Sequence, residues 1–229
     1  GGDRGEKARI AQNRQKEERG QTVVSKEKWK YLLYTAGHPN DGFYWIRHQD
    51  RGSVLIAVLL VILYSVCFSM NRIYAGFVVN DIDPRSVNSI AELGGVALLF
   101  VVLCAGNWSV TCLMEGEGRF RDIVIAIGYS LLPMIVGTVL ATFVSQIVAE
   151  NEEAFYSIIM GIGTAYTVIM MLIGIMQVHN YTLGKTLITL LLTVIAVFII
   201  IFLGLLIVNF ITQVYSFLRS IYIELVFRF

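Results

Sequence analysis

The sequence predicts an all-α, polytopic membrane protein with five transmembrane helices. Five stretches contain no Asp, Glu, Lys or Arg: residues 52–71, 93–114, 123–149, 154–184 and 186–218. Each can cross a bilayer, because an α-helix rises about 1.5 Å per residue and the hydrocarbon core is roughly 30 Å thick. A hydrophobic content of 56% and a mean hydropathy of +0.67 agree with this class and argue against a soluble domain.

The elements follow from this pattern in chain order. Residues 1–30 are rich in Lys, Arg, Glu and Gln and form a polar, basic arm, and residues 31–229 form the membrane domain. Residues 31–51 group aromatic side chains around an expected turn at 38–42, which is typical of an amphipathic segment at the membrane interface. The expected spans are about 53–71, 90–113, 123–148, 154–178 and 186–211.

Beyond the fifth span, polar residues recur every four positions, at Ser216, Ser220, Glu224 and Arg228. The remaining circumference is apolar. This spacing predicts an amphipathic C-terminal helix over 214–229, lying either on lipid or on a partner protein.

The distribution of basic residues predicts the orientation. Eleven of the 18 Lys and Arg residues precede the first span. With a cytoplasmic N-terminus, three more lie inside (Arg119, Arg121 and Lys185) and four lie outside (Arg72, Arg85, Arg219 and Arg228). Cytoplasmic loops carry an excess of Lys and Arg, so we expect the N-terminus inside and the C-terminus outside. The arm either contacts anionic lipid or another subunit, or is a solvated tail, and the second interpretation is favoured.

Polar and kinking residues inside the spans predict helix packing rather than chemistry. Pro133 cannot donate its backbone amide and its ring crowds the carbonyl of Tyr129, so the third span should kink in mid-membrane. Asn107 and Ser109, beside Trp108, are expected to hold helices together rather than to bind a substrate. Within the predicted spans the ionisable residue is Glu92, which lies near the outer end of its span. An ion path should offer several ionisable residues near the middle of the membrane, so this function is disfavoured.

Candidate enzymatic and metal-binding features are weak. The three histidines and three cysteines form neither an HExxH nor a CxxC pattern, so no metal or other cofactor is expected. No histidine falls within a predicted span, so an intramembrane serine protease would lack its base. The segment Gly116–Phe120 resembles a phosphate loop only superficially, because no strand precedes it and no Gly-Lys-Ser/Thr follows. We therefore expect no catalytic activity.

Two short polar loops are expected on the inner side of the membrane. The first carries Glu115, Arg119 and Arg121, and the second carries His179, Asn180 and Lys185. Together they either form a docking surface for a partner or are two solvated turns with glycine at the bends. The residues alone support both interpretations about equally.

The third span also carries a family resemblance. The run Gly128-Tyr129-Ser130-Leu131-Leu132-Pro133 resembles the Gly-Tyr-x-x-x-Pro motif of the Yip family, five-span proteins named for their interaction with Ypt/Rab GTPases. Four further segments resemble those of bacterial members: Asn107-Trp108, residues 116–123, residues 179–185 and residues 38–43. The resemblance covers roughly residues 37–229. The Asp-Leu-Tyr-Gly-Pro motif of eukaryotic members does not occur, which favours a bacterial relative.

The resemblance implies a non-enzymatic membrane protein that works through partners. Some bacterial relatives resemble accessory components encoded beside ABC-type sugar permeases. Our hypothesis is an accessory or scaffolding subunit of a transport complex in a bacterial cytoplasmic membrane. Its expected partners are membrane lipids and other membrane subunits, with transporter permeases among them, and no nucleic acid. The alternatives are a self-sufficient permease or channel, a trafficking protein with a GTPase partner and, last, a membrane-embedded hydrolase.

Overall fold

The computed structural model describes residues 27–80, 82–149 and 152–228, so residues 1–26 of the predicted arm 1–30 lie outside them. Residues 27–37 are helical. The elements that follow are α2 (Pro39–Gln49), α3 (Val54–Tyr74), the 3₁₀ helix η1 (Pro84–Ser86), α4 (Ser89–Leu113), α5 (Phe120–Ser130), α6 (Leu132–Ser145), α7 (Glu153–His179) and α8 (Leu183–Arg228).

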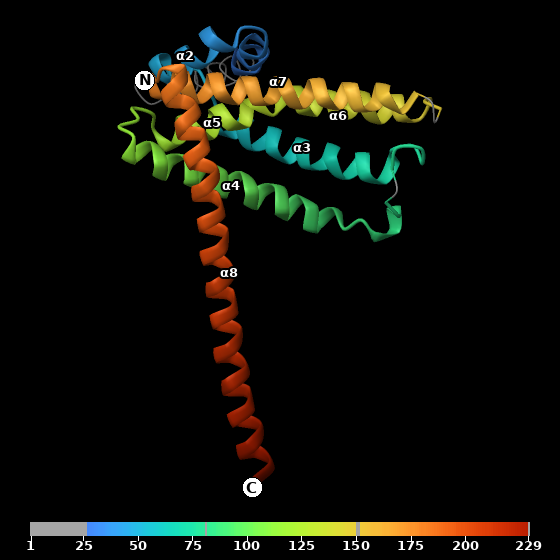
Figure 1. The fold of residues 1–229 in the computed structure, drawn as a ribbon, viewed down its shortest axis with the longest axis vertical. Coiled ribbons are helices and arrows are strands. Elements are labelled where there is room, and N and C mark those ends of the chain that lie inside the picture. The colour runs from blue at the N-terminus through green and yellow to red at the C-terminus, as the bar shows by residue number, and fades with distance from the viewer. Residues whose placement is uncertain (1–26, 81, 150–151, 229) are drawn as a thin grey trace, which may run out of the picture.

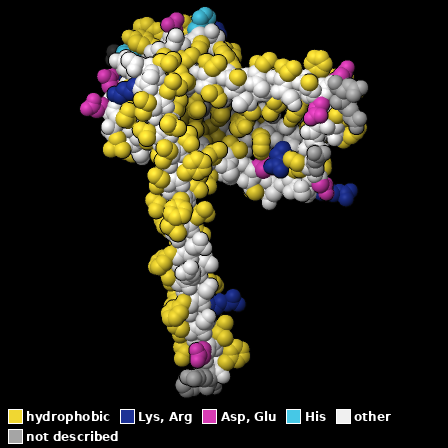
Figure 2. Space-filling model, viewed as in Figure 1, with side chains coloured by type: hydrophobic (Ala, Val, Ile, Leu, Met, Phe, Trp, Pro, Cys, Tyr) yellow, Lys and Arg dark blue, Asp and Glu magenta, His cyan; other side chains and the backbone are white. Residues whose placement is uncertain are grey.

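The prediction of five membrane-spanning helices is confirmed by length and composition. The described residues contain five apolar helical segments long enough to cross a bilayer: α3, α4, α5 with α6, α7, and α8. Their bounds agree with the expected spans to within a few residues, except at the end of α8. In Figure 2 the charged side chains gather at the two ends of the bundle and apolar side chains lie between them.

The centre of the bundle is α5. In Figure 1, α3, α4, α6 and α7 lie side by side, and α5 leads into α6 at the end of the bundle nearest α2. Ile123, Ile125, Ala126 and Tyr129 of α5 are almost completely buried. Because these side chains face neighbouring helices on several sides, α5 forms the core of the protein rather than a lipid-facing surface.

The predicted kink in the third span is confirmed. The span is divided into α5, which ends at Ser130, and α6, which begins at Leu132 with Pro133 in its first turn. The N–H of Leu131 bonds to the carbonyl of Gly128, three residues back, which tightens the junction. The kink positions α6 along α7, where a Cβ built on Gly137 would lie 3.2 Å from the Cα of Gly163.

The turn expected at residues 38–42 is wrong. His38 is the N-cap of α2 and residues 39–42 form its first turn, which begins with Pro39 at a position where the missing N–H is not needed. Gly42 has no positive φ. It is required for close approach instead, because a Cβ there would lie 2.7 Å from the Cα of Thr35. The expected interfacial segment therefore folds as two short helices whose apolar residues, such as Leu32 and Phe43, enter the core.

The expected boundary near residue 212 is also absent from the described chain, because α8 continues as one helix of 46 residues. Residues 209–216 contain no glycine or proline that would end it. The helix runs across the direction of the other spans and extends well beyond them (Figure 1). Only its first turns pack on the bundle, and the side chains of residues 201–227 are exposed.

Candidate functional site

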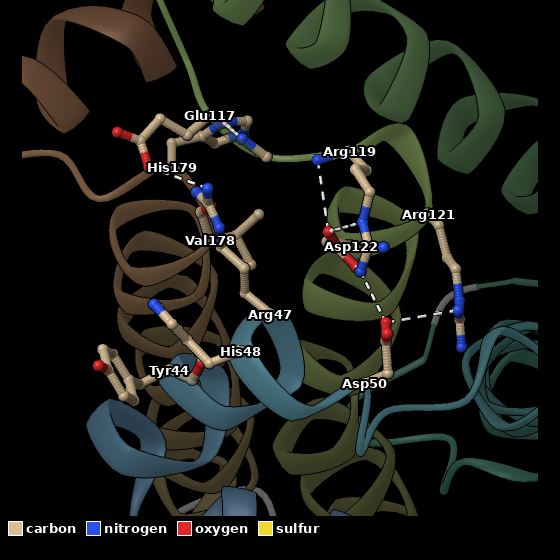
Figure 3. Close-up of polar contacts among 11 residues, drawn as sticks. Tyr44, Arg47, His48, Asp50, Glu117, Arg119, Arg121, Asp122, Val178 and His179 are labelled. Atoms are coloured by element: carbon tan, nitrogen blue, oxygen red, sulfur yellow. Dashed lines mark hydrogen bonds and ion pairs between the residues drawn. The ribbon is translucent and has the colours of Figure 1, made fainter.

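Both predicted polar loops meet α2 at one end of the bundle, which we call the α2 end. It comprises residues 47–53, 114–122 and 178–185. These ranges contain the first residues of α5 and α8 and the last residues of α2 and α7, and they adjoin the start of α3 and the end of α4. Figure 3 shows its polar contacts. Segments more than 60 residues apart in the sequence come together here.

Arg119 is the centre of the charged cluster. Its guanidinium lies 2.6 Å from the carboxylate of Asp50 and 2.9 Å from that of Asp122. Asp122 is buried at the start of α5, and its carboxylate also accepts from the backbone N–H of Arg119. Arg121 reaches Asp50 at 3.5 Å. In Figure 3, Arg119 and Arg121 both point toward Asp50.

These contacts stabilise the charged forms of the groups. The hydrogen bond and the positive charge of Arg119 hold the pKa of Asp50 below its usual value, and Arg121 and Lys28 act in the same direction. The neighbouring carboxylates of Asp122 and Asp50 raise the pKa of Arg119. Asp50 and Arg119 are therefore ionised at neutral pH.

Arg47 joins α2 to both loops. Its guanidinium donates to the carbonyl of Val178 at 2.8 Å, at the end of α7, and contacts the carboxylate of Glu117 at 2.9 Å. The carbonyl of Val178 lies in the last turn of α7, where the partial negative charge of a helix end favours a cation. One side chain thus connects α2, α7 and the loop 114–119.

His179 is a structural residue. Its side chain is 1% exposed, so a partner cannot contact it directly, contrary to the prediction. Its Nδ1 accepts from the backbone N–H of Gly118 at 3.1 Å, and its ring stacks on Tyr181. A Cβ at Gly116 or at Gly118 would lie 2.7 Å from Nδ1 of this ring. The Gly-x-Gly pattern therefore lets the loop lie against His179.

The other predicted partner-facing residues lie on the surface of the α2 end. Glu115, Arg119, Arg121 and Asn180 are exposed. Glu115 and Asn180 both have positive φ, at 55° and 54°, so they form tight bends as well. Lys185 is half-buried, with its ammonium group 4.5 Å from the ring centre of Tyr181. The geometry brings all five together at one end, and whether they bind a partner stays a prediction.

The residues predicted to be structural make the contacts expected of that role. Asn107 is fully buried in α4 and donates to the hydroxyl of Thr193 in α8 at 3.1 Å. The ring of Trp108 packs edge-on against Phe120 at the start of α5. The buried hydroxyl of Tyr129 accepts from the N–H of Ser53, directly before α3. Ser109, by contrast, is exposed and donates to Ala105 of its own helix, so it joins no helices.

Sequence reasoning missed the partners of the predicted residues. Asp50 was not predicted, yet it binds Arg119 from 69 positions away. The sequence does offer a signal for Asp50. The charged pair Asp50-Arg51 comes directly before the first span, so it is expected at the same membrane surface as the two polar loops. A second missed pair, Arg72 and Glu92, lies at the opposite end of the bundle, where their side chains are 2.9 Å apart and join α3 to α4.

The chemistry available at the α2 end is ionic and hydrogen-bonding. The described residues contain no group of three His, Cys, Asp or Glu side chains arranged to hold a metal ion. Asp50 and Asp122 are engaged by Arg119, and Glu117 by Arg47. The arrangement can present an ordered surface of both charges to another molecule.

The fold and this surface define the class as a multi-pass, all-helical integral membrane protein. A family model described as the Yip1 domain matches residues 35–217, which is most of the chain. The protein therefore belongs to the Yip1 domain family, as its Gly-Tyr-x-x-x-Pro run predicted. No curated protein and no solved structure matches the chain.

Proposed function

We propose that the protein is a non-enzymatic accessory or scaffolding subunit of a membrane transport complex, and that its α2 end binds the partner subunits. The observation that carries this proposal is the loop 114–119, which is charged, exposed and held in place. The N–H of Gly116 bonds to the carbonyl of Thr111, and the hydroxyl of Tyr181 donates to the carbonyl of Met114. An ordered loop loses little conformational entropy when a partner binds.

The charges of the α2 end suit a protein partner. The side chains of Asp50, Glu117 and Arg119 are 55–58% exposed, and that of Arg121 is 45% exposed. Each is already oriented by an ion pair within the chain. Alternating charges at fixed positions favour a complementary surface and disfavour wrong partners, which gives specificity more than raw affinity.

The orientation and location that we propose place the α2 end in the cytosol of a bacterium. Eleven of the 18 basic residues precede α3, which favours a cytoplasmic N-terminus and, after five spans, an external C-terminus. The resemblance to bacterial relatives encoded beside sugar permeases supports an ABC-type sugar transporter as the complex. The α2 end then faces the same compartment as the nucleotide-driven part of such a transporter.

The test is purification of the complete protein in a mild detergent, with mass spectrometry of what accompanies it. We expect stoichiometric recovery of permease subunits with the native chain and a severalfold loss with Arg121→Glu. Arg121 is a suitable probe because its contact with Asp50 is long, at 3.5 Å, so its reversal leaves the bundle intact. The matched control is Arg85→Glu, an exposed arginine in η1 at the opposite end of the bundle.

Recovery of a single species without permeases, in the native chain and both variants, would contradict the accessory role. A self-sufficient permease would then become the leading alternative. Reconstitution of the purified chain in vesicles and measurement of solute flux would test that alternative directly.

A further inference from the structure

A hollow of about 550 Å³ lies between the first described helix and the chain that leads into α3. We call it the basic hollow. Its lining residues are Glu27, Lys28, Lys30, Tyr31, Tyr34 and Arg51. It takes no part in the ion pairs that join α2 to the polar loops.

The lining combines positive charge with a rigid aromatic wall. Lys28, Lys30 and Arg51 supply three cations against the single carboxylate of Glu27. Tyr31 is buried, and its hydroxyl donates to the carbonyl of Gly42 at 2.6 Å, so its ring is held in place. The hollow therefore has a net positive charge and one fixed side.

Arg51 is oriented by this wall. Its guanidinium lies 5.8 Å from the centre of the Tyr31 ring, a cation–π contact that keeps the cation at the hollow. The ring of Tyr34 stacks on that of Tyr31 and extends the wall. An arginine fixed in this way presents its donors as a fork, which suits the oxygens of a phosphate group.

The hollow lies at the level of lipid headgroups. Arg51 precedes Val54, the first residue of the apolar helix α3, by three positions. Tyr34, which lines the hollow, is 44% exposed, and Leu55 in the first turn of α3 is 68% exposed. Aromatic and basic side chains are enriched at the boundary between hydrocarbon and water, where one part of the side chain contacts lipid and another contacts water.

From these observations we propose that the basic hollow binds the phosphate-bearing headgroup of an anionic phospholipid. The phosphate occupies the space between Arg51 and the two lysines, and the acyl chains of the same molecule run from the hollow toward the apolar side chains at the start of α3. A lipid is a better occupant than a soluble phosphate ester, because Arg51 lies three residues before the apolar helix α3, at the level where the headgroup phosphates of a bilayer lie. This inference does not depend on the transport partner proposed above.

The test compares lipid binding to the complete, delipidated protein by native mass spectrometry. The probes are phosphatidylglycerol and phosphatidylcholine with the same acyl chains. We expect one phosphatidylglycerol to bind in preference to phosphatidylcholine. A basic residue near an anionic membrane contributes roughly a fivefold preference, so Lys28→Gln with Arg51→Gln should lower the preference by about 25-fold.

A matched double variant controls for general loss of charge. Lys185→Gln with Arg85→Gln also removes two positive charges, but neither residue lines the hollow. It should keep the preference for phosphatidylglycerol. Thermal unfolding of both double variants in detergent checks that they are folded, since the lysines and Arg51 are outside the buried core.

Two outcomes would overturn the proposal. One is an unchanged preference for phosphatidylglycerol in the folded Lys28→Gln and Arg51→Gln protein. The other is displacement of bound lipid by millimolar inorganic phosphate without any preference between the two lipids, which would assign the hollow to a soluble phosphate.

Discussion

Replacing Gly118 by alanine should destabilise the α2 end, because the loop 114–119 lies directly against the last turn of α7. A Cβ at this position would be 2.6 Å from Cε1 of His179 and 2.6 Å from a methyl group of Val178. Both neighbours are almost completely buried. The loop must therefore shift away, and the hydrogen bond from Gly118 to His179 lengthens.

The cost follows from two effects. Inserting a methyl group into a well-packed site typically costs about 1–3 kcal/mol. Weakening one hydrogen bond adds about 1 kcal/mol. The two terms sum to about 2–4 kcal/mol. For a chain of this size roughly 2–4 °C are lost per kcal/mol, so the melting temperature should fall by about 4–16 °C.

The assay is thermal unfolding of the detergent-purified protein, followed by tryptophan fluorescence. Gly184→Ala is the matched control, because Gly184 lies near the same loops at the start of α8 and a Cβ there meets nothing within 4 Å. Alanine should be neutral or slightly stabilising in that helix. If Gly118→Ala and Gly184→Ala unfold at the same temperature, the contact of the loop with His179 does not require glycine at position 118, and the reasoning is refuted.

Three further changes have expected outcomes. Pro133→Ala should join α5 and α6 into a straighter helix and destabilise the protein by about 1–3 kcal/mol, measured by thermal unfolding in detergent, because α6 loses its position along α7. Thr193→Val removes the acceptor of Asn107 and should cost about 0.6 kcal/mol, and at most roughly 1.7 kcal/mol, in the same measurement. The pKa of Asp50 is lowered beside Arg119, so the ion pair contributes to the stability at neutral pH and this contribution is lost as the pH falls through the lowered pKa. Asp50→Asn should therefore abolish this acid-dependent loss of stability, measured by thermal unfolding as a function of pH.

Controls exist for each of these changes. Thr212→Val should be silent, because the exposed Thr212 donates only to the carbonyl of Val208 in its own helix. Arg119→Gln should remove the same loss of stability at acid pH as Asp50→Asn. If this loss persists in both variants, it comes from another carboxylate. An unchanged complex and an unchanged melting temperature in Pro133→Ala would show that the kink does not determine helix packing.

The candidate site was only partly predictable from the sequence. The exposed loop residues Arg119 and Arg121 stood out because charged residues directly between two apolar stretches must lie at a membrane surface. The prediction that His179 faces a partner was wrong. A histidine directly after an apolar run can lie on the surface or be covered by a glycine-containing loop, and the local sequence is the same in both cases. The difference depends on Gly116 and Gly118, whose contacts with the ring come from tertiary packing.

Short helices were also difficult to predict. Residues 38–42 contain proline, asparagine, aspartate and glycine, which are typical of a turn, but the same proline is favourable at the first position of a helix. Contact with Thr35 across the junction decided between these two structures.

The sequence by itself determined the class of protein, the number of spans, the kink at Pro133 and the surface position of the charged loops. Each depends on local chemistry: about 20 uncharged apolar residues suit the hydrocarbon core, and proline interrupts a helix wherever it occurs. Only the tertiary structure decided that Asp50 pairs with Arg119, that His179 is buried and that α8 crosses the other helices. These features depend on groups far apart in the chain, and an ion pair or a buried ring is stabilised only when the fold brings its neighbours within a few ångströms.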